Sequence, residues 1–280
     1  MTTGIDVKSK ILHNELNTVE IFFIIFFGIL GTAIGSFLNV VTDRLPAGKS
    51  LVYPPSGCDA CQHRLSWLDL FPVFSYLFLR GRCRYCQTKI PIRILWVELG
   101  TGLLTAFLYW FFGWKPMLPV SIVYCSVLIV IAIIDMNHQL ILNKIVFPAA
   151  VVALIVNFFV PDLFSMHNLL FGLLGGAFGF VFLGLAAIFS LVIFKKEGMG
   201  MGDIKMAAMI GLMVGFPNVI VALFGGILLG GLTAIFLVIF KKKSRKDIIP
   251  FGDFLSAGTI ITLLWGSQII HWYLRISKLE

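Results

Sequence analysis

Long apolar runs limit most strongly how this chain can fold. Eight hydrophobic segments follow one another, at residues 19–41, 95–113, 117–135, 142–160, 168–194, 205–216, 218–240 and 252–274. Most of them exceed the roughly 18 residues needed to cross the hydrocarbon core of a bilayer. Because a segment in lipid must satisfy its own backbone hydrogen bonds, we predict an all-α polytopic membrane protein with about eight transmembrane helices. The segment 205–216 is short, and Phe216-Pro217-Asn218 is expected to end it.

Composition excludes a soluble domain. The chain of 280 residues is 59% hydrophobic and only 13% charged. Its net charge of +8 is interpreted through membrane topology, and we expect no nucleic-acid partner. Residues 1–18 form a polar N-terminal segment, and the apolar run that follows is too long for the core of a cleavable signal peptide.

The distribution of Lys and Arg predicts the orientation. Eight of these residues lie in the loop 42–94, three in 195–205 and five in 241–249. If every middle segment crosses, these three regions share one side of the membrane, which the positive-inside bias makes cytoplasmic. Both termini then face away from the cytoplasm. The predicted organisation is an N-terminal segment 1–18, a first transmembrane helix 19–41, a cytoplasmic loop domain 42–94 and a membrane bundle 95–280.

Four of the five cysteines lie in the cytoplasmic loop, as two CxxC pairs. The pairs are Cys58–Cys61 and Cys83–Cys86. Two cysteines three residues apart in a tight turn can reach one ion, and zinc takes four thiolates in this way. A reducing cytoplasm disfavours disulfides between them. We therefore predict one zinc ion, which would also stabilise a loop with little core of its own. Cys125 lies within an apolar segment and is expected to fill space there.

Two aspartates lie at the predicted cytoplasmic edge of the membrane. Asp135 ends the third segment, and Asp203 follows Gly200-Met201-Gly202. Ionisable groups at this depth are costly and usually functional. Two adjacent carboxyls share a proton, so one can deprotonate water while the other donates a proton. The simpler interpretations are that Asp135 sits in the headgroup region and that Asp203 is a helix N-cap. The glycines would let the backbone leave helical geometry beside a substrate.

Together these stretches resemble the type IV prepilin peptidases, which are polytopic GxGD aspartic proteases of bacterial inner membranes. The resemblance rests on Gly35-Ser36-Phe37-Leu38-Asn39 with Arg44-Leu45-Pro46, the two CxxC pairs with Ser75 to Gly81 between them, Arg93 with Glu98, Asp135 with His138 to Ile141, and Gly200 to Met206. They occur in the family's order, from about residue 30 to 257.

The resemblance implies a specific activity. The family removes the basic leader from prepilins and from the pseudopilins of type II secretion, on the cytoplasmic side. Members with the four-cysteine loop also N-methylate the new terminal residue with S-adenosylmethionine. In the family, the aspartates that match Asp135 and Asp203 are catalytic, and the four cysteines bind zinc. Lys205 is a candidate for supporting Asp203, and Glu98 for contacting the basic leader.

The chain departs from the family pattern in two places. Leu142-Asn143 stands where the family commonly has Pro-Asp, and Pro250-Phe251-Gly252-Asp253 stands where it usually has Pro-Phe-Gly-Pro. Asp253 adds a third acid, which we expect to pair with Lys242 or Lys205. Competing interpretations are a transporter with a broken helix at GxGD and a non-catalytic protein of pilus or secretion assembly. The sequence leaves open the oligomeric state, the particular prepilins and the S-adenosylmethionine pocket, because no glycine-rich nucleotide loop follows a strand.

Overall fold

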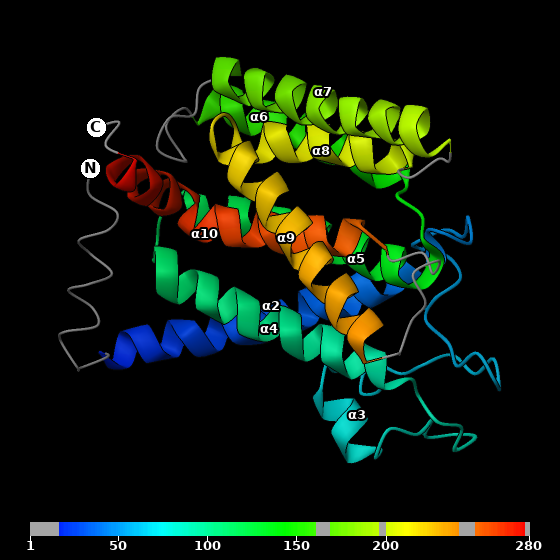
Figure 1. Ribbon diagram of the computed structural model, residues 1–280. Helices are drawn as coiled ribbons and strands as arrows, with labels where there is room; N and C mark the ends of the chain where they lie inside the picture. Colours follow the sequence, from blue (N-terminus) through cyan, green and yellow to red (C-terminus); the bar gives the residue numbers. More distant parts are fainter. Residues whose placement is uncertain (1–16, 161–168, 196–199, 241–249, 278–280) are drawn as a thin grey trace. The chain divides into compact units, whose positions relative to one another are not determined.

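The structure is a computed structural model that describes residues 17–160, 169–195, 200–240 and 250–277. The described residues form helices and no strands, apart from two isolated bridges. The fold class predicted from the sequence is confirmed. The long helices are α2 (Thr18–Arg44), α4 (Ile92–Phe112), α5 (Met117–His138), α6 (Asn143–Phe159), α7 (Leu169–Phe194), α8 (Met201–Val214), α9 (Asn218–Ile239) and α10 (Gly252–Ile276) (Figure 1).

All eight apolar segments are helices, and their ends lie close to those expected. A five-residue helix, α3 (Phe74–Phe78), lies in the cysteine loop and was not predicted. Helix α8 begins at Met201 rather than at residue 205, so Asp203 lies inside its first turn. The predicted pairing of Asp253 with Lys242 falls partly on residues outside the described ranges.

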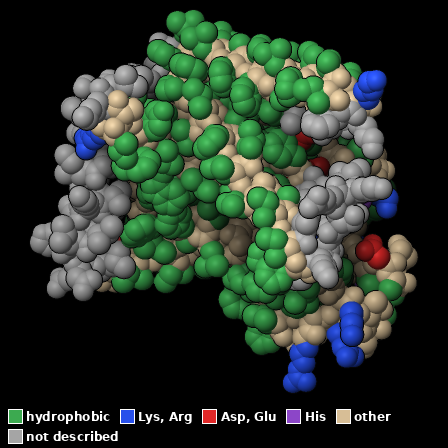
Figure 2. Space-filling view, viewed as in Figure 1, with side chains coloured by type: hydrophobic (Ala, Val, Ile, Leu, Met, Phe, Trp, Pro, Cys, Tyr) green, Lys and Arg blue, Asp and Glu red, His purple; other side chains and the backbone are tan. Residues whose placement is uncertain are grey.

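Within the described ranges, six helices are long and apolar enough to cross a membrane: α2, α4, α5, α7, α9 and α10. Helix α6 is also apolar but has only 17 residues. Helix α8 has 14 residues, which span about 21 Å of a hydrocarbon core about 30 Å thick. The chain is therefore a multi-pass membrane protein. Figure 2 shows hydrophobic side chains over the outward face of α7, where Leu185 and Phe189 are more than half exposed, as lipid contact requires.

The chain divides into two compact units, residues 1–122 and 123–280. In the first unit, α2 and α4 lie side by side (Figure 1). A Cβ added at Gly35 of α2 would fall 2.8 Å from Glu98 Cα of α4, so the two backbones meet where one has no side chain. The rings of Phe27 and Tyr109 stack at 4.8 Å further along the same pair. The cysteine loop connects these two helices and therefore belongs to the same unit.

In the second unit, α8 is the central helix. It contacts α6, α7, α9 and α10, and its side chains from Met206 to Val214 are largely buried. The backbones of α7 and α8 approach so closely that a Cβ added at Gly175 would lie 2.9 Å from Gly215 Cα. Asp203 is thus carried on a short helix that is enclosed by its neighbours. This arrangement explains how a helix too short to cross alone is held in the bundle.

Candidate active site and metal centre

Asp135 lies in the last turn of α5 and is 5% exposed. The helix ends just beyond it, because Gln139 adopts a left-handed φ of 53° after its N–H bonds to the Asp135 carbonyl. The Asp135 side chain points into the bundle, where its Oδ2 accepts a hydrogen bond of 2.7 Å from the Gly252 backbone N–H. A buried carboxyl that accepts from the backbone N–H groups of Gly252 and Asp253 still keeps acceptor capacity for a water or a substrate group.

Asp203 is the third residue of α8, and Gly200 is the N-cap. Its Oδ2 accepts a hydrogen bond of 3.2 Å from the Gly200 N–H. The carboxylate therefore caps the helix by reaching back from N3, as in one half of a capping box. The simple interpretation of Asp203 as the N-cap residue itself is wrong, although the side chain does satisfy one of the free N–H groups of this terminus.

The two carboxyls influence each other. Asp203 lies outside the six candidate spans, and burial raises the pKa of its carboxyl to about 6, with the charge of Asp135 as the second cause. A like charge raises a carboxyl pKa in this way only at short range. The two carboxyls, which the sequence analysis expects to meet, thus lie within electrostatic reach of each other in one compact unit. An acid that keeps its proton close to neutral pH beside a second carboxyl suits general acid–base chemistry.

Gly252, the first residue of α10, is a site residue that our sequence analysis did not single out. A Cβ at this position would lie 2.8 Å from Asp135 Oδ2 and 3.2 Å from its Cγ. Only glycine lets the N–H of residue 252 reach the carboxylate at 2.7 Å. The contact joins residues 117 positions apart in the chain. The available signal was the Pro250-Phe251-Gly252 motif, which gives no indication of its partner.

Replacing Gly252 by Ala is expected to lower the catalytic rate by about 100-fold, because displacing a catalytic group by about 1 Å has an effect of this size. The added methyl group must push the Asp135 carboxyl away and break its hydrogen bond. The rate should be measured as peptide cleavage by purified enzyme in detergent. Gly231→Ala in α9 is the matched control, since a Cβ there meets open space. Equal rates for both variants would contradict the positioning role.

The residues around Asp203 hold α8 in place. A Cβ at Gly202 would lie 2.8 Å from Ile141 Cβ, so this glycine lets α8 approach the segment after α5. Neither Gly200 nor Gly202 has a positive φ. Lys205 Nζ donates a hydrogen bond of 3.2 Å to the Asn143 side-chain oxygen at the start of α6. Among the described residues Lys205 forms no ion pair with Asp203 or Asp253, so its observed contact ties α8 to α6.

Two further acidic residues have partners close by. Glu98 is 5% exposed in α4, and its Oε2 accepts a hydrogen bond of 2.7 Å from the Val73 N–H in the cysteine loop. Asp253 Oδ1 accepts a hydrogen bond of 2.9 Å from the Phe254 N–H. Glu98 belongs to the first unit and Asp253 to the second. The observed contact of Glu98 is thus structural and links the loop to a membrane helix.

The four loop cysteines converge as the sequence predicts. The sulfur atoms of Cys58, Cys61, Cys83 and Cys86 all lie within 4.8 Å of one another, and no disulfide joins them. The Cys58 and Cys86 sulfurs are 3.7 Å apart. Four thiolates at about 2.3 Å from a tetrahedral zinc ion would be about 3.8 Å apart. The donor set and its spacing therefore fit zinc.

The two CxxC pairs form near-identical turns. The Gln62 N–H bonds to the Cys58 carbonyl at 2.8 Å, and the Gln87 N–H bonds to the Cys83 carbonyl at 3.0 Å. Both glutamines have φ near 58°, a left-handed conformation that reverses the chain after each pair. Hydrogen bonding with the Thr88 side chain, and then with its backbone, lowers the pKa of Cys86 to about 6. A thiolate near neutral pH is ready to bind a cation.

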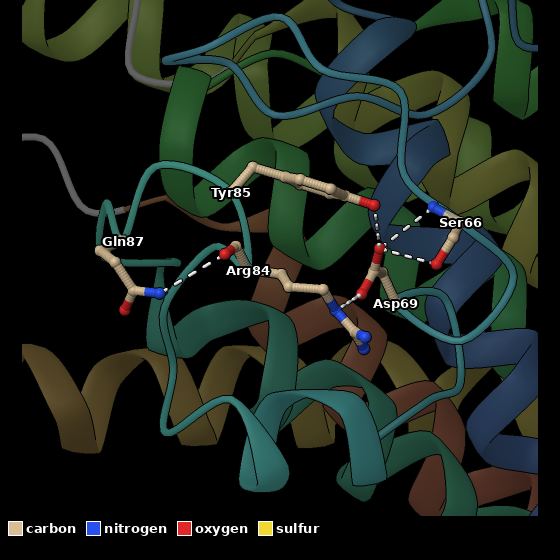
Figure 3. A network of polar contacts seen from close by, with 5 residues as sticks. All are labelled: Ser66, Asp69, Arg84, Tyr85 and Gln87. Atoms are coloured by element: carbon tan, nitrogen blue, oxygen red, sulfur yellow. Dashed lines mark hydrogen bonds and ion pairs between the residues drawn. The ribbon is translucent and has the colours of Figure 1, made fainter.

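A polar network connects the second turn to the chain that follows the first (Figure 3). Asp69 Oδ2 accepts hydrogen bonds from the Ser66 hydroxyl at 2.8 Å and from the Tyr85 hydroxyl at 3.4 Å, and Arg84 Nε lies 2.8 Å from Asp69 Oδ1. Burial opposes ionisation of Asp69, but the Ser66 hydrogen bonds and the Arg84 charge outweigh it and lower its pKa. The network holds Arg84 and Tyr85 between the paired cysteines Cys83 and Cys86.

Comparison with known proteins identifies the family. Residues 29–112 match the bacterial Peptidase A24 N-terminal domain, and residues 122–235 match the type IV leader peptidase family. Proteins named prepilin leader peptidase/N-methyltransferase are 33% identical in Pseudomonas aeruginosa and 31% identical in Bacillus subtilis. The first match covers 89% of this chain and 92% of the relative, and the second covers 89% and 97%. No solved structure matches. The chain belongs to the type IV leader peptidase family.

Proposed function

We propose that this protein is an aspartic endopeptidase that removes the basic leader from type IV prepilins and pseudopilins, and then N-methylates the exposed terminal residue. The observation that carries the proposal is the pair Asp135 and Asp203, two carboxyls from different helices that influence each other at one end of the second unit. The name of these relatives, prepilin leader peptidase/N-methyltransferase, supports the substrate class and the second activity.

The cleavage mechanism follows from the pair. One carboxylate takes a proton from a water molecule, and the water oxygen attacks the carbonyl carbon of the scissile peptide bond. The other carboxyl, which carries a proton, donates it to the leaving nitrogen as the C–N bond breaks. The Gly252 N–H holds Asp135 in position through this exchange. Because the two carboxyls titrate as a unit, the roles of general base and general acid are assigned to the pair and not to one aspartate each.

We infer that the active site faces the cytoplasm of a bacterial cell with the protein in the inner membrane. The last turn of α5, the first turn of α8 and the start of α10 meet at one end of the second unit. The chain just before α8 contains Lys195 and Lys196, as the positive-inside bias predicts for a cytoplasmic end. A prepilin with a transmembrane helix and a basic cytoplasmic leader would present its cleavage site at this end.

We assign N-methylation to the protein, but we assign no pocket to the methyl donor. S-adenosylmethionine would supply the methyl group, and the free amine of the shortened substrate would accept it. The described residues include no glycine-rich nucleotide loop after a strand, so none is assigned to this cofactor. Zinc would be held by Cys58, Cys61, Cys83 and Cys86 and would fix the loop between α2 and α4.

The test uses purified wild-type protein in detergent with a type IV prepilin, with and without S-adenosylmethionine. Mass spectrometry should show loss of the leader in both samples and the gain of one methyl group only where the methyl donor is present. An uncleaved prepilin across several substrates would overturn the proposal and favour a transporter or a non-catalytic assembly protein. Cleavage without methylation would reject the second activity alone.

A further inference from the structure

The cysteine loop carries a cluster of exposed apolar side chains that neither the metal site nor the peptidase site uses. Phe71 precedes α3 and is 51% exposed, while Phe74, Leu77 and Phe78 of α3 are 54%, 59% and 84% exposed. We call these four residues the α3 apolar cluster. A soluble surface seldom gathers large apolar side chains in this way, so the cluster marks an interaction site.

The depth of α3 along α4 indicates what covers this cluster. The Val73 N–H, at the start of α3, donates to Glu98 Oε2 at 2.7 Å. Glu98 lies six residues inside α4, about 9 Å along the helix axis from its first residue. Figure 1 shows α3 beside the first turns of α4. Since α4 is long and apolar enough to span a membrane, this contact would place α3 at the level of the membrane surface.

Neighbouring side chains of α4 mark the same depth. Arg93, the second residue of α4, forms an ion pair with Asp43 near the end of α2. Trp96, in the first turns of α4, is 63% exposed. Arginine at the end of a span and tryptophan just inside it are the usual markers of the headgroup region. The hydrogen bond from Val73 to Glu98 ties the α3 apolar cluster to α4 at this same level.

A basic pocket adjoins α3 at the same end of α4. Its volume is about 490 Å³, and it is lined by Tyr76, Arg80, Gly81, Arg82, Lys89, Ile90, Pro91 and Ile92. Its wall is fixed by a hydrogen bond of 3.3 Å from the Tyr76 hydroxyl to the Ile90 carbonyl, and by one of 2.8 Å from the Ile90 N–H to the Gly81 carbonyl.

The cations of the pocket have no acidic partner among the described residues. Within the described part of the loop, the ion pairs are Arg84 with Asp69 and Arg93 with Asp43. No carboxylate in the part of the chain that the structure describes pairs with Arg80, Arg82 or Lys89. These three cations around one pocket at the start of a membrane helix complement an anionic phosphate.

We propose that the segment from Phe71 to Lys89 is a lipid-binding anchor: the α3 apolar cluster enters the membrane interface, and the pocket of Arg80, Arg82 and Lys89 binds the phosphate of an anionic phospholipid. Amphipathic anchors combine a buried apolar face with attraction to anionic lipid in this way. Glu98 is the positioning residue, because it fixes the start of α3 against α4. The inference does not rest on the proposed enzymatic function.

The first test places a photo-crosslinking amino acid at Phe78 in full-length protein reconstituted into vesicles of phosphatidylglycerol and phosphatidylethanolamine. Ala60, an exposed residue between two of the cysteines, is the control position. Irradiation should give phospholipid adducts at position 78 and few or none at position 60, as counted by mass spectrometry. Cross-links at position 78 to a second protein chain in place of lipid, or equal lipid labelling at both positions, would overturn the anchor.

The second test measures phosphatidylglycerol retained by the detergent-solubilised protein in native mass spectrometry. The double variant Arg80→Gln/Lys89→Gln should bind it about 25-fold more weakly, at about fivefold for each cation removed near a phosphate. The charge-matched control Lys49→Gln/Arg64→Gln should retain wild-type binding. Equal lipid loss in both variants would overturn the lipid site. It would also be overturned if both variants retained lipid and only the pocket variant lost S-adenosylmethionine binding. Equal melting temperatures confirm that both variants are folded.

Discussion

Replacing either Asp135 or Asp203 by Asn is expected to reduce leader removal by at least about 1,000-fold, within the range that general acid–base catalysis contributes. Asparagine has nearly the same shape, so it preserves packing and can keep the contact to the Gly252 N–H at Asp135 and to the Gly200 N–H at Asp203. What it removes is the ability to exchange a proton. The measurement is the initial rate of prepilin cleavage in detergent, at equal protein concentration.

The matched control is Asp253→Asn, the third acid at the same end of the unit, whose carboxylate accepts a hydrogen bond from the Phe254 N–H. This variant should cleave at close to the wild-type rate. Methylation of a substrate supplied without its leader reports whether the two inactive variants are folded, and it should persist in both. Cleavage that survives at either Asp135→Asn or Asp203→Asn would eliminate the pair as the catalytic machinery.

Replacing Cys58 by Ser is expected to lower zinc affinity by more than about 100-fold, because even the loss of a group that only supports a ligand costs 10- to 100-fold. Cys58 lies 3.7 Å from Cys86 within the four-sulfur cluster, and a serine hydroxyl is a much poorer zinc ligand than a thiolate. Methylation should fall with the metal content, whereas some cleavage should remain, because the proposed carboxyl pair lies in the other compact unit.

The measurement is zinc per chain by elemental analysis after dialysis, together with methylation of a pre-cleaved substrate. Cys125→Ala is the control, since this thiol is buried in α5 and lies outside the cluster. It should leave the metal content unchanged. Full zinc content in Cys58→Ser would show that the metal is held elsewhere, and wild-type protein without zinc would reject the site.

The sequence predicts the helices and the cysteine cluster well because both signals are local. A run of about twenty apolar residues has one stable state in a membrane, so eight helices could be placed with ends accurate to a few residues. Two cysteines three residues apart likewise indicate a tight turn at their own position in the chain. Whether the two pairs meet depends on how the whole loop folds. The 3.7 Å separation of the Cys58 and Cys86 sulfurs supports the prediction that they do.

The features that the sequence does not predict depend on contacts across the fold. The hydrogen bond from Gly252 to Asp135 joins residues far apart in the chain, and nothing near either residue specifies it. Helix α3 has five residues, too few for a hydrophobic period to appear. The glycines of the GxGD stretch predict an unwound backbone, yet α8 already starts at Met201. The close approach of Gly202 to Ile141 explains why one of these glycines is needed.

The short, enclosed helix α8 also has a consequence for biogenesis. A segment of 14 residues does not partition into a bilayer by itself, and α8 gains its favourable contacts only from α6, α7, α9 and α10. We therefore expect the insertion machinery to pass α8 over until later helices have been synthesised. The aspartate it carries would then reach Asp135 only after nearly the whole chain has been translated, so a nascent enzyme would be unable to cleave peptides before its last helix is in place.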